Sequence, residues 1–291
     1  MRNPIIVALD VADEAKAVAL AAQVAPFVGA FKVGKELFVS AGPDFIRRLR
    51  QTGAAVFLDL KFHDIPSIVA KAVAAATRLD VQMLTVHTSG GSEMMRAAER
   101  AAQTTADELG RPAPPLVLGV TVLTSLDTAA LAELGWETDV ATQVERLARL
   151  AATAGLRGLV CSPLELAGLR KILPPAVQLV SPGIRSVHDK ADDQKRTLSP
   201  RDALAAGASW LVIGRPIYAA ADPAAAAQAI LASLPLTVAL VTPGLRRLTD
   251  QLKSDPSAHH SPSHGHPTPA TSHTSHAHPD DKSDDVKRKT H

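Results

Sequence analysis

Residues 55–61 read Ala-Val-Phe-Leu-Asp-Leu-Lys, an apolar run that ends in charged residues. Runs that are apolar almost continuously are typical of parallel strands, because helices cover both faces of a parallel sheet. A helical stretch rich in alanine follows at Ser67–Arg78. This order of strand, polar end and helix predicts one β/α unit.

The same pattern recurs along the first 234 residues. Strand-like runs are predicted at Ile5–Asp10, Phe31–Gly34, Ala55–Lys61, Met83–Thr88, Leu116–Leu123, Gly158–Ser162, Gln178–Ile184 and Trp210–Pro216. Helices are predicted at Asp13–Ala25, Pro43–Gln51, Ser67–Arg78, Ser92–Glu108, Val140–Ala154, Pro163–Ile172, Pro200–Ala206 and Pro223–Ser233. Candidate N-caps and first-turn prolines mark several helix starts: Asp13, Ser92, Ser199, Pro163, Pro200 and Pro223.

Eight strand–helix units in about 230 residues favour a closed (β/α)8 barrel over an open doubly wound sheet. The dinucleotide-binding form of the open sheet also lacks its signature, because no GxGxxG motif follows the first strand. We therefore predict an α/β protein whose residues 1–234 form a (β/α)8 TIM barrel that carries the catalytic site.

Polar residues gather at the C-terminal ends of the predicted strands, the rim where active sites of this fold are built. They are Asp10, Lys32, Asp59, Lys61, His87, Thr124, Arg185 and Arg215. Asp59 and Lys61 are two residues apart, so on a strand both point to the same face, toward the mouth of the barrel. Asp64 falls in the following loop. The Asp59–Lys61 pair is either catalytic or a structural ion pair that caps the barrel.

A candidate phosphate site follows the last two strands. The segment Ser181-Pro-Gly-Ile-Arg185 and a polar loop containing Gln194 come after the seventh, and Ile213-Gly-Arg-Pro216 comes after the eighth. Loops at these two places commonly bind phosphate in this fold. Gly214 would let backbone N–H groups approach an anion, and Arg215 offers a charged fork for its oxygens.

The segment Asp59-Leu-Lys-Phe-His-Asp-Ile-Pro66 resembles the signature of bacterial orotidine 5′-phosphate decarboxylases. Further similar segments follow in order: Ala8-Leu-Asp10, Phe31-Lys-Val-Gly34, Val86-His-Thr-Ser-Gly-Gly91, Gly119-Val-Thr-Val-Leu-Thr-Ser125, Ser181-Pro-Gly-Ile-Arg185, Asp193-Gln194 and Ile213-Gly-Arg-Pro216. The resemblance implies conversion of orotidine 5′-phosphate to uridine 5′-phosphate and CO₂, the last step of de novo UMP synthesis. It also implies that no metal or organic cofactor takes part.

The resemblance further implies how the charged residues act. Lys61 would stabilise a carbanion at C6 of the pyrimidine and then protonate it, and Asp59 would sit beside the substrate carboxylate. Asp64 would reach the site of a second subunit, so the enzyme would be a homodimer with shared active sites. Lys32, Asp59, Lys61 and Asp64 would then form a chain of alternating charge.

The same resemblance assigns the substrate contacts. Asp10 and Lys32 would hold ribose hydroxyls, and Thr124 would lie near the pyrimidine ring. The phosphate would be held by Arg185, Gln194, Gly214 and Arg215, with the 185–198 loop closing over it. One position departs from the family pattern, because Ile68 stands where a threonine usually contacts the ribose of the neighbouring subunit's substrate.

Composition and charge argue against several kinds of partner and site. The formal net charge is +2, from 31 basic and 29 acidic residues, which gives no reason to expect a nucleic-acid or membrane partner. Cys161 is the single cysteine, which excludes an internal disulfide and a multi-cysteine metal site. No apolar run approaches the ~18 residues of a membrane span. The N-terminus lacks the features of a signal peptide, so we expect a soluble cytoplasmic protein.

Residues 235–291 differ in character from the barrel. A short Val/Leu stretch leads into Ser, Pro, Thr, Asp, Lys and eight of the eleven histidines. Such a segment cannot bury enough apolar surface to offset its ordering entropy, so disorder is expected. Its histidines could bind nickel or zinc weakly, or the tail could be a solvated extension.

One enzymatic alternative remains at this point. A sugar-phosphate lyase of the same superfamily shares the Asp-x-Lys-x-x-Asp pattern but uses magnesium to stabilise an enediolate. Two features argue against such a lyase: the continuation Phe62-His-Asp-Ile-Pro66 and the pair Thr124-Ser125. We expect His63 to shape the loop, and His87 to be a hydrogen-bonded residue of the rim.

Overall fold

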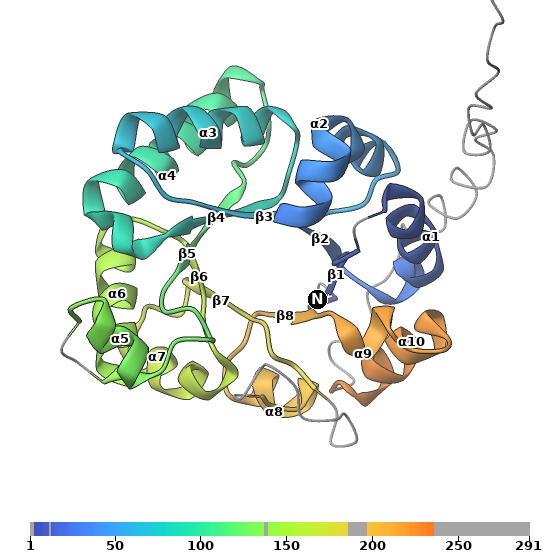
Figure 1. The fold of residues 1–291 in the computed structure, drawn as a ribbon. Coiled ribbons are helices and arrows are strands. Elements are labelled where there is room, and N and C mark those ends of the chain that lie inside the picture. Colours follow the sequence, from blue (N-terminus) through green and yellow to red (C-terminus); the bar gives the residue numbers. More distant parts are fainter. Residues whose placement is uncertain (1–2, 12, 137–138, 186–196, 236–291) are drawn as a thin grey trace, which may run out of the picture. The chain divides into compact units, whose positions relative to one another are not determined.

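A computed structural model describes residues 3–11, 13–136, 139–185 and 197–235. Its strands form a closed parallel barrel in chain order, in which β1 pairs with both β2 and β8 (Figure 1). The strands are β1 (Ile5–Ala8), β2 (Ala30–Gly34), β3 (Val56–Phe62), β4 (Met83–His87), β5 (Leu116–Val120), β6 (Gly158–Val160), β7 (Gln178–Ser181) and β8 (Trp210–Ile213). The predicted (β/α)8 barrel is confirmed.

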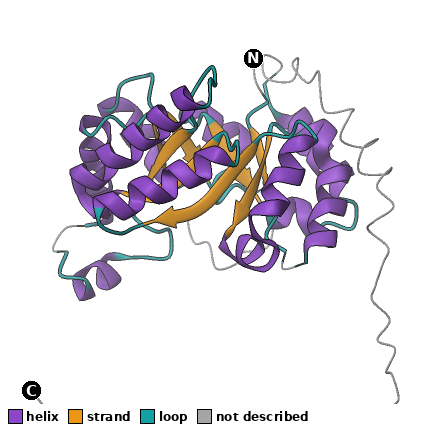
Figure 2. Ribbon diagram, turned by 90° about the horizontal axis from the view of Figure 1, so that it is seen from above, coloured by secondary structure: helices purple, strands orange, loops and turns teal. Residues whose placement is uncertain are grey.

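Helices surround this barrel, and the strands run through its centre (Figure 2). They are α1 (Glu14–Val24), α2 (Lys35–Gln51), α3 (Pro66–Arg78), α4 (Gly91–Glu108), α5 (Thr128–Glu133), α6 (Val140–Thr153), α7 (Leu166–Ile172), α8 (Pro200–Ala205), α9 (Arg215–Tyr218) and α10 (Pro223–Ser233). Single turns of 3₁₀ helix occur at Ala25–Phe27, Thr88–Gly90 and Pro163–Glu165. Within the described ranges, none of the helices has the length and apolar character needed to cross a membrane.

The helix starts test the predicted caps. Asp13 and Ser199 are confirmed, because their side chains accept hydrogen bonds from the backbone N–H groups of Lys16 and Asp202. The prediction for Ser92 is wrong: α4 begins one residue earlier, behind Gly90. The prolines at 163, 200 and 223 all occupy first turns, as predicted.

Three helical segments differ from the sequence prediction. Helix α2 begins at Lys35 and not at Pro43, and Gly42 interrupts it with a non-helical φ of 71°. Pro43 therefore starts only the second part of α2. The other two, α5 and α9, were not predicted, because six and four residues are too few to show a helical period.

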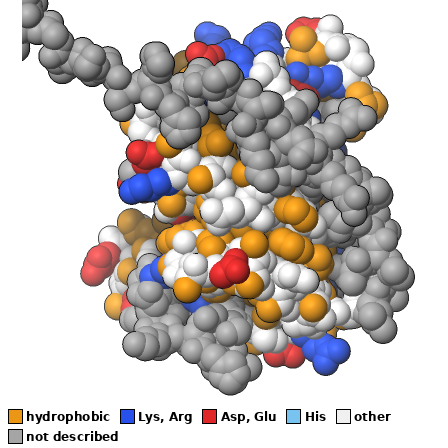
Figure 3. Space-filling view, turned by 90° about the vertical axis from the view of Figure 1, so that its right-hand side faces the viewer, with side chains coloured by type: hydrophobic (Ala, Val, Ile, Leu, Met, Phe, Trp, Pro, Cys, Tyr) orange, Lys and Arg blue, Asp and Glu red, His pale blue; other side chains and the backbone are white. Residues whose placement is uncertain are grey.

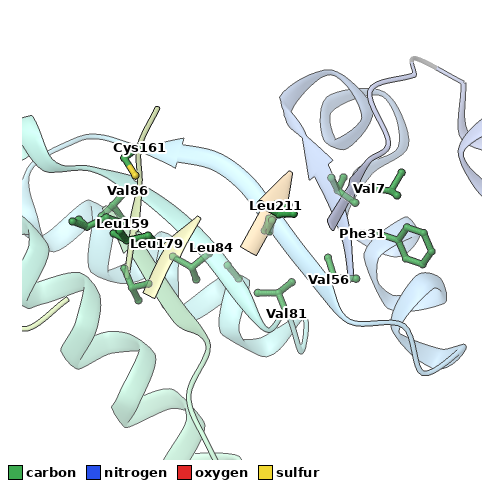
Figure 4. Close-up of a cluster of buried hydrophobic side chains, with 14 of the residues drawn as sticks. Val7, Phe31, Val56, Val81, Leu84, Val86, Leu159, Cys161, Leu179 and Leu211 are labelled. Carbon is green, nitrogen blue, oxygen red and sulfur yellow. The ribbon is translucent and has the colours of Figure 1, made fainter. Parts of the chain in front are cut away.

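Apolar side chains form two separate layers of core. One layer fills the barrel interior and consists of Ile6, Ala8, Ala30, Phe57, Met83, Leu116, Leu118, Val180, Trp210 and Val212. The other lies between the strands and the helices, and Figure 4 shows part of it, including Val7, Phe31, Val56 and Leu211. Successive residues of each strand alternate between the two layers, as side chains on a strand must.

This alternation decides which residues reach the mouth of the barrel. Ala8 of β1 and Ala30 of β2 point inward, so Asp10 and Lys32, two residues later, continue on the inner face. Phe57 of β3 leads in the same way to Asp59. Apolar side chains thus fill the barrel interior, and the charged residues lie next to them at the C-terminal ends of the strands.

The side of the barrel formed by α1 and α10 faces the viewer in Figure 3. Hydrophobic side chains spread over much of its described surface, with few charges among them. The exposed residues of these helices include Ala15 and Ala19 of α1 and Ala225 and Ala229 of α10. Neither helix contributes a residue to the cavity described next.

Candidate active site

A cavity of about 510 Å³ opens at the C-terminal ends of the strands. Its lining comprises Ala8, Asp10, Lys32, Phe57, Asp59, Lys61, Val120, Val122, Leu123, Thr124, Ser125, Val160, Cys161, Pro182, Gly183, Arg185, Val212, Gly214, Arg215 and Tyr218. Every strand except β4 contributes to this lining, directly or through the loop that follows it. The volume lies within the range of pockets that bind small molecules.

Four charged residues form a line of alternating sign along one wall of the cavity. We call Asp10, Lys32, Asp59 and Lys61 the charge line. The Lys32 Nζ lies 2.8 Å from Asp10 Oδ1 and 3.8 Å from Asp59 Oδ2. The Lys61 Nζ donates to both carboxylate oxygens of Asp59, at 2.8 and 2.9 Å. Each of the two inner charges therefore has an opposite neighbour on both sides.

The middle of the charge line is well buried. The side chains of Lys32 and Asp59 are 11% and 13% exposed. Burial by itself would raise the pKa of Asp59, but the Lys32 and Lys61 cations and the hydrogen bonds from Lys61 and Thr85 outweigh it, so that this pKa is lowered. Asp59 is therefore ionised at neutral pH.

A bulge in β3 brings Lys61 into the cavity beside Asp59. The pairing of β3 with β4 passes from Leu58↔Leu84 to Phe62↔Val86, so four steps along β3 match two along β4. Lys61 lies within this interval and has a φ of 54°, in the left-handed region that residues with a Cβ seldom adopt. Asp59 and Lys61 both line the cavity, as predicted: regular strand alternation from Phe57 places Asp59 there, and the bulge places Lys61.

Asp64 lies apart from the charge line within this chain. Its side chain is exposed in the loop before α3, where Oδ1 accepts a hydrogen bond from the backbone N–H of Ile65 at 2.6 Å. It does not line the cavity, and no ion pair among the described residues includes it. Its predicted place in a neighbouring subunit's site stays a prediction.

The other predicted substrate contacts stand around the same cavity. Thr124 after β5, Arg185 after β7, and Gly214 and Arg215 after β8 all line it. Gly214 leaves little room for a side chain, because an added Cβ would lie 3.3 Å from Tyr218 Cε1, a tighter contact than most Cβ atoms make. Gln194 and most of the 185–198 loop lie outside the described residues.

Two further titratable groups stand near the site. The rings of His63 and His87 lie with centroids 5.4 Å apart and planes tilted by 45°. Burial, followed by the charges of His63, Lys61 and Lys35, lowers the pKa of His87 to about 4, so this imidazole is neutral at pH 7. His87 does not line the cavity.

Cys161 lies between the barrel and its surrounding layer. It belongs to the outer core cluster and also touches the cavity. Burial and the neighbouring Glu165 raise the pKa of its thiol, so the group stays protonated at neutral pH. Cys161 is therefore a small core residue and not a nucleophile.

Sequence reasoning missed two residues that the structure places at the site. Thr85 is fully buried on β4, and its hydroxyl contacts both Asp59 and Lys61. Tyr218 lines the cavity from the short helix α9. The sequence held a signal for Thr85, since it follows Met83 on the inward face of β4.

Known proteins resemble this chain over its whole barrel. Residues 3–230 match the model of the Orotidine 5'-phosphate decarboxylase / HUMPS family. The orotidine 5′-phosphate decarboxylase of Moorella thermoacetica is 50% identical over 234 residues, which cover 80% of this chain and 92% of that protein. That of Opitutus terrae is 55% identical over 203 residues, covering 70% of this chain and 86% of that protein.

A solved structure of a related protein is also similar to this chain in three dimensions. The crystal structure of orotidine 5′-phosphate decarboxylase from Lactobacillus acidophilus superposes with a TM-score of 0.69 at 37% sequence identity. The matched region covers 78% of this chain and 97% of that one. The similarity therefore extends over the whole barrel of that protein.

Proposed function

The chain belongs to the orotidine 5′-phosphate decarboxylase / HUMPS family, and from that premise we propose that it converts orotidine 5′-phosphate to uridine 5′-phosphate and CO₂. It is an enzyme of the carboxy-lyase class that acts in pyrimidine synthesis. We further propose that it works as a cytoplasmic homodimer and without a metal or organic cofactor.

The charge line is the observation that best supports this proposal. Removing CO₂ from the pyrimidine leaves an electron pair on C6, and no neighbouring carbonyl can delocalise it. Stabilisation must then come from charges already in place, which act strongly where water is excluded. The largely buried, alternating charges of Lys32, Asp59 and Lys61 supply such a preorganised field at the wall of the cavity.

In the proposed reaction, the bond between C6 and the carboxylate carbon breaks and CO₂ leaves. The electron pair stays on C6, where the Lys61 ammonium stabilises it and then donates a proton. Lys61 regains that proton from solvent. Asp59, which accepts two hydrogen bonds from the Lys61 ammonium, aims that group and lies beside the substrate carboxylate.

The phosphate is held at the other group of polar residues. Arg185 and Arg215 offer charged donors, Gly214 lets the backbone come close, and Gln194 is assigned from sequence alone. Asp10 and Lys32 would hold ribose hydroxyls, and Thr124 would lie near the pyrimidine ring. Binding energy from the unreacting phosphate can then help to hold the base against the charge line.

Asp64 gives a reason for the dimer. Its carboxylate finds no cation within the described part of its own chain, whereas Lys61 already stands in a line of alternating charge. Ile65 and Ile68 beside it are 63% and 44% exposed, which suits a surface that a second subunit covers. We propose that Asp64 of each subunit extends the charge line of the other.

One assay tests the activity directly. Purified protein is incubated with orotidine 5′-phosphate, and the loss of the substrate's ultraviolet absorbance is followed with and without a metal chelator. We expect turnover that the chelator leaves unchanged. No loss of absorbance would refute the proposed activity, and abolition by chelator would favour the magnesium-dependent alternative.

A further inference from the structure

Thr85 connects the two residues at the reacting end of the charge line. Its side chain is fully buried on β4, the strand that gives no residue to the cavity lining. The Oγ1 of Thr85 accepts a hydrogen bond from the backbone N–H of Lys61 at 2.8 Å. The same oxygen lies 3.0 Å from Asp59 Oδ1. One hydroxyl group thus contacts both members of the Asp59–Lys61 pair.

The chemistry of the three groups fixes the direction of both bonds. An amide N–H can only donate, and an ionised carboxylate can only accept. The Thr85 hydroxyl therefore receives the Lys61 N–H on a lone pair and gives its single proton to Asp59. Neither bond can reverse, so the hydroxyl is held in one orientation and links the two residues rigidly.

The bulge in β3 makes this link necessary. Between Leu58 and Phe62 the regular pairing with β4 is interrupted, so the N–H of Lys61 loses the carbonyl partner that an ordinary strand would provide. Lys61 also holds a left-handed φ of 54°, which a residue with a Cβ adopts only when its surroundings impose it. The Thr85 hydroxyl takes the place of the missing carbonyl.

We propose that Thr85 is a positioning residue for the reaction: it holds Lys61 in its left-handed conformation and orients the Asp59 carboxylate toward the Lys61 ammonium. This inference rests on the proposed decarboxylation. Thr85 itself does not touch the cavity, so it acts through Asp59 and Lys61.

The test compares three variants with the parent protein. Thr85→Val keeps the shape of the side chain but removes the hydroxyl, and Thr85→Ser keeps the hydroxyl. Thr77→Val is the matched control, since Thr77 is also fully buried but its hydroxyl donates to the Val73 carbonyl of its own helix, away from the charge line. For each variant, kcat, KM and the melting temperature are measured.

We expect Thr85→Val to lower kcat by about 100-fold, the loss that a displacement of about 1 Å at a reacting group can cause. KM should change by less than about threefold, because the phosphate contacts after β7 and β8 remain. Thr85→Ser should stay within about fivefold of the parent, losing only the χ1 restriction of the methyl group. Thr77→Val should retain the parent's kcat.

The outcomes separate this inference from the proposed function. An inactive parent refutes the function itself, whereas an active parent with a Thr85→Val kcat within about threefold overturns only the role of Thr85. Equal losses in Thr85→Ser and Thr85→Val would also overturn it, because the hydroxyl would not matter. If Thr85→Val does not fold, Thr85→Cys replaces it, because a thiol is only a weak hydrogen-bond donor and acceptor. The kcat of Thr85→Cys is then judged by the same limits as that of Thr85→Val.

Discussion

The two polar regions of the cavity are built in different ways. The charge line at the C-terminal ends of β1, β2 and β3 is held by ion pairs of 2.8 and 3.8 Å between its members, by the bulge in β3 and by the hydroxyl of Thr85. The phosphate region consists of Arg185, in the loop after β7, and of Gly214 and Arg215, where β8 leads into α9. The charges proposed for the chemistry are thus fixed before substrate arrives, as electrostatic preorganisation requires.

The largest expected effect concerns the charge line. Lys61→Ala removes both the proposed proton donor and the ammonium nearest the reacting carbon, so kcat should fall by at least about 10⁴-fold. The melting temperature should show that the barrel still folds. Activity within about tenfold of the parent would contradict the role of Lys61 as proton donor.

Loss of a cation from the phosphate region should mainly affect a substrate that carries a phosphate. Arg215→Ala should lower kcat/KM for orotidine 5′-phosphate by about 10- to 100-fold, the worth of a charged hydrogen bond. It should have little effect on the slow reaction of the nucleoside that lacks phosphate. Equal losses on both substrates would mean that Arg215 acts structurally.

Subunit mixing tests whether the charge line continues across a dimer. Asp64→Asn and Lys61→Ala proteins should each be inactive, yet a mixed dimer contains one site with native Lys61 and native Asp64 of the partner subunit. Random exchange should restore about a quarter of the parent activity, given the two-fold symmetry of such a dimer. Demonstrated subunit exchange without any recovery would refute shared sites.

A substitution of Ile68, at the same proposed interface, should have a smaller effect on kcat/KM. Ile68→Thr would add a hydroxyl near the neighbouring subunit's ribose, and one neutral hydrogen bond contributes about 0.5–1.5 kcal/mol. We expect kcat/KM to rise by no more than about tenfold, mostly through KM. A thousandfold rise would show the natural protein to be catalytically impaired and would cast doubt on its function.

The tail should have the smallest effect. Cutting the chain after Leu252 removes most of the Ser, Pro and His-rich segment, which has no core-forming pattern. The kinetic constants and the melting temperature should stay as in the full chain. A clear loss of either would show that this segment binds the barrel.

The sequence predicted the barrel because each β/α unit carries its own local signal. The inward alternation of Ile6 and Ala8 leads to Asp10, and that of Phe57 leads to Asp59, so most of the charge line follows from strand parity. The helices α5 and α9 escaped prediction because their six and four residues hold less than two turns.

The contacts that hold the charge line in place could not be predicted from the sequence. The left-handed φ of Lys61 and the bulge depend on how β3 meets β4, and a threonine within an apolar strand gives no sign of which groups its hydroxyl will contact. The ion pair between Asp10 and Lys32 likewise depends on the register of β1 and β2. Contacts between strands, unlike the strands themselves, are set by tertiary packing.

The proton transfer to C6 offers the most direct test of the account. Turnover in heavy water should give uridine 5′-phosphate with one deuterium at C6, because the ammonium of Lys61 exchanges its protons with solvent before donating one. Mass spectrometry and proton NMR of the product would locate the label. Uridine 5′-phosphate formed with hydrogen alone at C6 would contradict a C6 carbanion protonated by Lys61.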